Sequence, residues 1–274
     1  MEKINLEKKT RKRIPKRIII SVAILTVILA LAVTWAALTD VIILRKTEDM
    51  AGSENAISIL FVGNSQVFIG ELPRQLKTIA GMYGIEIVYK DISRHGNRGG
   101  SLNELKEKAI NEIQSRRFDY VVLHDDARQP NNNIEEFLSD VQFLCDEARE
   151  NDVMPVLYNA AVWNNNGQPD EKRQSVSTEA YKRAAIENDV ILLNAGDAWA
   201  YAYQTIPGIS LYTRFDPRGP HANNAGGFFT ACVVAAVLFD LHIEEIPKNN
   251  LYKGSDAIEL AQTAWNFVQL SLNK

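Results

Sequence analysis

The chain of 274 residues has few of the side chains that bind metals or form covalent cross-links. It contains two cysteines and four histidines, and no spacing of these residues resembles a zinc site. Cys145 and Cys232 each lie in an apolar helical pattern, where a small buried side chain is the ordinary interpretation and a disulfide outside the cell is the alternative. We therefore expect no metal ion and no cofactor.

Positive charge is scarce after the first 46 residues. From Thr47 onward the chain has 20 lysines and arginines against 31 aspartates and glutamates. Proteins that bind nucleic acid need a basic surface, so this composition excludes nucleic acid as a partner. The same part of the chain has no internal repeat and no long low-complexity tract. Its length suffices for one substantial core, which favours a single domain.

The N-terminus has the opposite character. Residues 1–17 contain eight basic and two acidic side chains, and the 22 residues from Ile18 to Thr39 carry no charge. As a helix, that run would be roughly 33 Å long, which is enough to cross a hydrocarbon core of about 30 Å. The pattern predicts a basic cytoplasmic tail at 1–17, a transmembrane anchor at 18–44, a linker at 45–56 and an extracytoplasmic domain at 57–274. The expected location is the cell membrane, with a single pass.

A cleaved signal peptide is the alternative for this N-terminus, and Ala30-Leu31-Ala32 offers a cleavage site. The apolar run is longer than the usual signal core of about 7–15 residues, which favours an uncleaved anchor.

Strand and helix patterns alternate after the linker. Such alternation predicts an α/β fold in which helices cover both faces of a mainly parallel, five-stranded sheet. The apolar runs that read as buried strands are 57–62, 86–90, 119–124, 153–158 and 189–193. The helical patterns lie near 70–82, 101–117, 134–150, 175–187, 224–240 and 257–272.

The most informative local feature is the turn Gly63-Asn64-Ser65, which follows the apolar run 57–62. This pattern predicts a buried strand that turns sharply into a helix and places the Ser65 hydroxyl at the carboxyl end of the strand, where open α/β sheets bind ligands. A nucleophilic serine needs a base, and His221 with Asp216 near the C-terminus could supply one. A simple helix cap is the other interpretation of Ser65.

With these residues in view, the chain resembles the SGNH (GDSL-type) serine hydrolases over roughly residues 57–242. The resemblance implies a flavodoxin-like three-layer α/β/α sandwich with Ser65 as nucleophile, His221 as base and Asp216 as its orienting carboxylate. It also implies that the backbone N–H groups of Ser65 and of Gly99 or Gly100 stabilise the oxyanion.

Two departures from the pattern of these enzymes matter. Their usual spacing is Asp-x-x-His, whereas here Arg218 occupies that position and Asp216 lies two residues earlier. These enzymes share four short sequence blocks, and the third block ends in a residue with a neutral donor to the oxyanion. Here Leu123 is followed instead by His124-Asp125-Asp126. We expect Asp126 to face the substrate and Asp125 to lie along the surface. Asn131 is a candidate for the missing donor.

The remaining candidates have competing interpretations. His95 and His124 compete with His221 as the base, His124-Asp125-Asp126 could be read as metal ligands, and His242 is expected at the surface. Trp163 is our candidate for substrate contact. Trp199 and Tyr201 could also line a sugar-binding cleft, and packing is an equal alternative for all three aromatic side chains.

The expected function is that of a membrane-anchored serine ester hydrolase that acts outside the cytoplasm. Its expected substrates are acylated carbohydrates or other small esters of the cell envelope, from which it would remove small acyl groups. An O-acyltransferase with the same Ser-His pair is one alternative. A non-catalytic envelope-binding protein that retains the fold is the other, because of the two departures.

Overall fold

The structure is a computed structural model that describes residues 48–93, 100–115, 117–163, 169–213, 221–243, 252 and 254–272, without the side chain of Arg128. The expected cytoplasmic tail and transmembrane anchor lie outside these residues, so both stay predictions. No helix within the described ranges combines the length and the apolar character that crossing a bilayer requires.

A six-stranded sheet forms the centre of the domain, in the order β1-β3-β2-β4-β5-β6. Neighbouring strands from β3 to β6 pair in parallel, whereas β1 pairs antiparallel with β3. The strands are β1 (Glu48–Asp49), β2 (Ile57–Val62), β3 (Ile87–Asp91), β4 (Tyr120–Leu123), β5 (Met154–Tyr158) and β6 (Ile191–Leu193). The parallel order puts the carboxyl ends of β2, β4, β5 and β6 along one edge of the sheet.

The sequence predicted five strands, whereas the sheet has six. The additional strand is β1, which lies within the segment that was expected to be a linker at 45–56. Glu48 and Asp49 pair with Lys90 and Tyr89, which makes them part of the sheet. A two-residue polar strand has no apolar run or alternation, so its sequence carries no strand signal. It forms because β3 offers it an edge.

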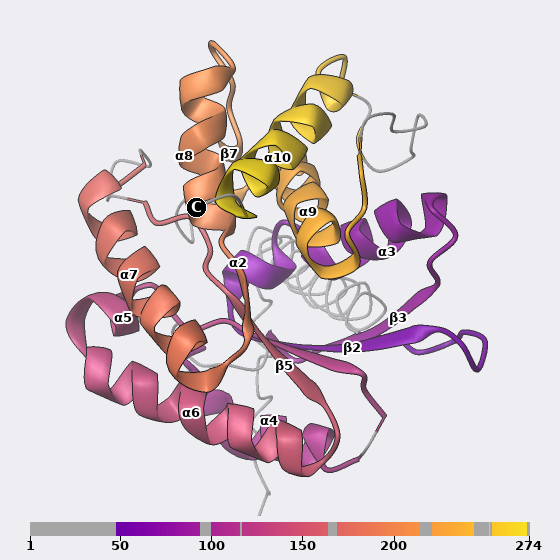
Figure 1. Ribbon diagram of the computed structural model, residues 1–274, viewed down its shortest axis with the longest axis vertical. Coiled ribbons are helices and arrows are strands. Elements are labelled where there is room, and N and C mark those ends of the chain that lie inside the picture. The colour runs from indigo at the N-terminus through magenta and orange to yellow at the C-terminus, as the bar shows by residue number, and fades with distance from the viewer. Residues whose placement is uncertain are drawn as a thin grey trace, which may run out of the picture. The chain divides into compact units, whose positions relative to one another are not determined.

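Helices cover both faces of the sheet. Figure 1 shows α4 and α6 on one face and α3, α9 and α10 on the other. Each layer of helices packs on the sheet through its own apolar cluster. The helices are α2 (Ser65–Phe68), α3 (Leu72–Met82), α4 (Leu102–Ile113), α5 (Arg128–Asn132), α6 (Ile134–Glu150), α7 (Glu171–Asn188), α8 (Ala195–Thr205), α9 (Asn224–Phe239) and α10 (Ala257–Leu272). The expected three-layer α/β/α architecture is confirmed.

Three elements near the carboxyl edge were not expected from the sequence. They are α5, α8 and a two-stranded hairpin of β7 (Tyr212–Thr213) and β8 (His221–Ala222). For α8, the helical signal in the sequence is weak because Gly196 in its first turn has a low helix propensity. A Cβ on Gly196 would lie 2.1 Å from Gln174 Nε2 on α7, so a larger residue there would displace the Gln174 side chain from its hydrogen bonds.

Candidate active site

Ser65 is the first residue of α2, immediately after β2 and its turn. Asn64 caps this short helix, since its Oδ1 accepts a hydrogen bond of 2.9 Å from the backbone N–H of Gln66. Gly63 is confined by its neighbours: a Cβ there would lie 2.9 Å from a Val67 methyl carbon and 3.0 Å from His124 Cβ. The turn therefore needs glycine, and it holds the Ser65 hydroxyl at the carboxyl end of the sheet.

His221 comes from the other end of the domain. It lies in β8, where it is the pairing partner of Thr213 in β7, and its side chain is buried. Two residues later Asn223 caps α9, accepting a hydrogen bond of 2.9 Å from the backbone N–H of Gly226. The hairpin and the start of α9 thus fix the backbone of His221 on both sides.

The two side chains meet. His221 Nε2 lies 2.8 Å from Ser65 Oγ, although the residues are 156 positions apart in the chain. The serine hydroxyl can donate to Nε2 when the neutral imidazole carries its proton on Nδ1. This distance is what a general base needs to remove the hydroxyl proton.

Close backbone packing brings the two segments together. A Cβ on Gly227 would lie 2.2 Å from the carbonyl oxygen of Gly70, and one on Gly226 would lie 1.9 Å from that of Leu211. The first turn of α9 therefore rests directly on the segment that follows α2. Gly226 and Gly227 are adjacent at the start of an otherwise apolar helix, and such a pair is a local signal of close approach between two backbone segments.

Gly100 lies beside the nucleophile turn. Its φ is +63°, in the left-handed region that favours glycine, and a Cβ would lie 3.0 Å from the carbonyl oxygen of Gly63. This position is compatible with the expected oxyanion role of its N–H group. Gly99 and Asp216, the other expected members of the site, lie outside the described residues, and their roles stay predictions.

Asp125 does not lie along the surface as expected; it is 1% exposed, whereas Asp126 is only half-buried. Asp125 Oδ1 accepts hydrogen bonds from the backbone N–H groups of Leu102 at 3.1 Å and Asp126 at 2.7 Å. Its own backbone N–H donates to the Tyr181 hydroxyl at 2.9 Å. The chain turns inward after β4 because Asp125 forms these hydrogen bonds. Leu102 and Tyr181 are distant in the chain, so the residues around Asp125 do not predict the turn.

The carboxyl group of Asp125 ties β4 to the first turn of α4, two residues from Gly100. Burial raises its pKa to about 7, against the lowering effect of the two hydrogen bonds to Oδ1. Its Oδ2 is buried and has no hydrogen-bond partner among the residues that the structure describes. An ionised carboxylate would leave that oxygen unsolvated, so the neutral acid is the better tolerated form.

His124 is buried beneath the nucleophile turn. Its Nδ1 lies 2.9 Å from the carbonyl oxygen of Tyr158 and its Nε2 lies 3.2 Å from Asn64 Oδ1. Burial lowers its pKa to about 4, so the neutral form donates from Nδ1 to Tyr158. The base that contacts Ser65 is His221, and His124 instead packs against the cap of α2.

The other candidates are spread around this site. Asn131 Nδ2 donates to the carbonyl oxygen of Ala127 at 2.8 Å, so its expected contact with the oxyanion stays a prediction. His242 is exposed and packs on Trp265, as expected for a surface residue, and His95 lies outside the described residues. Within the described ranges, no three His, Cys, Asp or Glu side chains are placed to share a metal ion, and both cysteines are free and buried.

Trp163 lies at the end of the segment that follows β5. Its ring contacts those of Trp199, at 5.2 Å between centroids, and Tyr212, at 4.6 Å. Tyr212 is adjacent to the pairing partner of His221 in the hairpin. Trp199 is buried and donates to Thr230, and Tyr201 packs on Phe267.

No protein-family model and no curated protein sequence matches the chain. Among solved structures it is similar to a DUF4886 family protein from Bacteroides uniformis, with 16% identity, a TM-score of 0.62 and coverage of 80% of this chain and 96% of the other. It is also similar to a putative SGNH hydrolase from Slackia heliotrinireducens, with 22% identity, a TM-score of 0.52 and coverage of 67% and 100%. The chain therefore has the fold of the SGNH hydrolases.

Proposed function

We propose that this protein is a serine ester hydrolase in which Ser65 is the nucleophile and His221 is the general base. The observation that carries the proposal is the distance of 2.8 Å between Ser65 Oγ and His221 Nε2 at the carboxyl edge of the sheet. The SGNH fold supports it, because that fold places a nucleophilic serine after the first strand of its parallel sheet.

In the proposed reaction, Ser65 Oγ attacks the ester carbonyl carbon while its proton moves to His221 Nε2. The oxyanion that forms is stabilised by the backbone N–H groups of Ser65 and Gly100. Collapse of this intermediate expels the alcohol, which takes the proton from His221, and leaves the acyl group on Ser65. Water, deprotonated by His221, then releases the acid and restores the serine.

The substrate assignment follows from the expected location. We propose that the domain acts outside the cytoplasm, held at the membrane by residues 18–44, and removes small acyl groups from carbohydrate or other cell-envelope esters. The length and charge pattern of the N-terminus support the anchor. A reporter fused after Lys46 should be found outside the membrane, and alkaline carbonate should not extract the full-length protein.

The catalytic proposal is tested with the purified full-length protein and a panel of p-nitrophenyl esters and acetylated sugars. We expect turnover of the short esters, and covalent labelling by a fluorophosphonate that Ser65→Ala abolishes. The matched control is Ser115→Ala, which removes an exposed hydroxyl in the turn just after α4. A folded protein that neither turns over an ester nor reacts with the phosphonate would support the non-catalytic alternative.

A further inference from the structure

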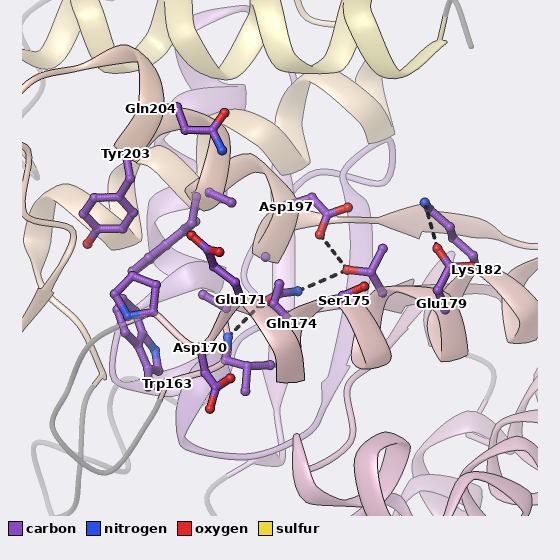
Figure 2. A pocket seen from close by; sticks show the side chains of 17 residues that line it. Trp163, Asp170, Glu171, Gln174, Ser175, Glu179, Lys182, Asp197, Tyr203 and Gln204 are labelled. Atoms are coloured by element: carbon purple, nitrogen blue, oxygen red, sulfur yellow. Dashed lines mark hydrogen bonds and ion pairs between the residues drawn. The ribbon is translucent and has the colours of Figure 1, made fainter.

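A cavity of about 620 Å³ lies beside the candidate active site, between the segment after β5, α7 as far as Lys182, and α8. Figure 2 shows the side chains that line it. Its volume is in the range of small-molecule sites, which is about 300–1,000 Å³. Its walls include neither Ser65 nor His221, so the catalytic proposal does not account for it.

Three aromatic residues are part of the cavity wall. They are Trp163, Trp199 and Tyr203, and Trp163 also contacts Tyr212 of the hairpin that holds His221. A ligand held against Trp163 would therefore lie one residue layer away from the hairpin. Aromatic faces of this kind attract apolar groups and cations, because the ring face carries partial negative charge.

The polar groups deep in the cavity are already bonded to one another. Gln174 Oε1 accepts from the backbone N–H of Val162 at 2.8 Å, and its Nε2 donates to Thr178 Oγ1 at 3.2 Å. The Thr178 hydroxyl donates to Asp197 at 2.6 Å. Figure 2 shows this chain of hydrogen bonds. Each of these groups already has a partner, so a neutral sugar would gain fewer new hydrogen bonds from them than from unbonded groups.

The cavity is strongly acidic, and one carboxylate in it is uncommitted. Four acidic side chains and one lysine line it. Asp170 caps α7 by accepting from Arg173 N, Glu179 pairs with Lys182 at 3.5 Å, and Asp197 accepts from Asn194 as well as Thr178. Glu171 forms no hydrogen bond or ion pair with another residue that the structure describes.

Lys182 is too far away to neutralise Glu171. The two residues are 11 positions apart on α7, or roughly 16 Å along the helix, and surface charges are screened over about 8 Å at physiological salt. Lys172 and Arg173 follow Glu171 on the helix but do not line the cavity. The end near Trp163 and Tyr203 thus combines aromatic faces with a carboxylate that forms no ion pair within the described ranges.

We propose that this cavity is a binding site for an organic ammonium group, with Trp163 and Tyr203 as its aromatic wall and Glu171 as its counter-charge. The surplus of carboxylates excludes anionic ligands, and the bonded polar floor disfavours neutral polyols. An alkylammonium ion is neither anionic nor dependent on hydrogen bonds to the polar floor. It is stabilised by cation–π contact with the aromatic rings and by the charge of Glu171. Binding at this site does not depend on the ester hydrolase proposal.

The test uses three probes of one shape and different charge. They are choline, its neutral carbon isostere in which a quaternary carbon replaces the nitrogen, and the anion tert-butylacetate. Their affinities are measured by calorimetry on the full-length Ser65→Ala protein in a non-ionic detergent, so that no turnover interferes. We expect choline to bind about three- to ten-fold more tightly than the neutral isostere, as an aromatic face and one exposed counter-charge would provide.

Variants then assign the effect to the cavity. Glu171→Gln should remove most of the preference for choline, and Trp163→Ala should weaken both choline and its isostere. The control is Glu187→Gln, which removes an exposed carboxylate at the far end of the same helix and should change nothing. Equal affinity for the three probes, preference for the anion, absence of any binding, or an unchanged preference in Glu171→Gln would each overturn the proposal.

Discussion

The ends of β2 and β4 are neighbours in the sheet, yet they hold their polar side chains in opposite ways. Val62 and Leu123 are pairing partners, and the backbone N–H of His124 donates to the carbonyl oxygen of Val62. After β2, the turn presents the Ser65 hydroxyl to His221. After β4, the chain buries His124 and Asp125 in bonds to the surrounding backbone.

The comparison shows that polar residues at the carboxyl edge of a sheet can serve either chemistry or support. A half-buried hydroxyl with one partner is available to react, whereas a buried carboxyl that accepts two backbone N–H groups braces the loop it contacts. The following experiments separate the two roles, because removal of a reactive group should change turnover and removal of a brace should change stability.

The largest effect is expected at the end of β2. His221→Ala and Ser65→Ala should each lower ester turnover by at least about 10³-fold with the fold intact, and the double variant should lose little more, because members of a catalytic unit are not additive. The test is a double-mutant cycle, in which the turnover of a p-nitrophenyl ester is measured for wild type, the two single variants and the double variant. Additive losses would show that the two residues act separately.

A smaller change in turnover is expected from Asp126, which is half-buried after β4, where the resemblance to the SGNH hydrolases predicts a neutral donor. Asp126→Asn should raise turnover at neutral pH by up to about 10²-fold, the contribution of one oxyanion donor. Loss of activity in the folded variant would instead assign the carboxylate a positive role, such as binding a cationic group of the substrate.

Replacement of His124 should destabilise the protein without removing the nucleophile. His124→Leu leaves the carbonyl oxygen of Tyr158 buried without its donor, and such a loss costs about 1–3 kcal/mol. Denaturant unfolding of the two proteins measures the difference. Turnover per folded molecule should fall much less than in His221→Ala, and an equal fall would mean that the base has been misassigned.

The smallest effect depends on pH and concerns Asp125. Folded protein keeps the proton of Asp125 up to about pH 7, whereas an unfolded aspartate loses it near pH 4. The native state thus binds more protons across this window, so this group lowers stability as pH rises from about 4 to 7. Asp125→Asn resembles the protonated acid and should remove that contribution.

Melting temperatures of wild type and Asp125→Asn from pH 5 to pH 8 test this prediction. The gap between them should widen in favour of the variant as pH rises. His124 contributes the opposite slope below about pH 6.5 in both proteins, because its proton is lost on folding, so it cancels in the difference. A gap that stays constant with pH would show that Asp125 is ionised throughout.

The features that the sequence predicted are those with strong local signals. The strand at 57–62, the Gly63-Asn64-Ser65 turn and the long helices appear close to their expected bounds, since apolar periodicity and turn residues encode them directly. His221 was predicted as the base from its place near the C-terminus and from the resemblance to the SGNH hydrolases, and the structure brings it to Ser65.

The features that the sequence did not predict depend on partners from elsewhere in the chain. The inward turn of Asp125 requires the α4 N-terminus and Tyr181, which are 23 and 56 residues away. Strand β1 requires an open edge of β3, and the cavity is formed jointly by the segment after β5, α7 and α8. No pattern within a short window of residues can report such contacts.

The contact between Gly70 and Gly227 also determines when the Ser65–His221 pair can form during synthesis of the chain. Ribosomes synthesise Ser65 long before His221, and the segment that carries the histidine rests on the segment after the serine only once α9 exists. A nascent or truncated chain that ends before residue 221 therefore has the hydroxyl but no partner for it. Any esterase activity would therefore appear only after nearly the whole domain has left the ribosome. Until then Ser65 would lack its base and remain unreactive.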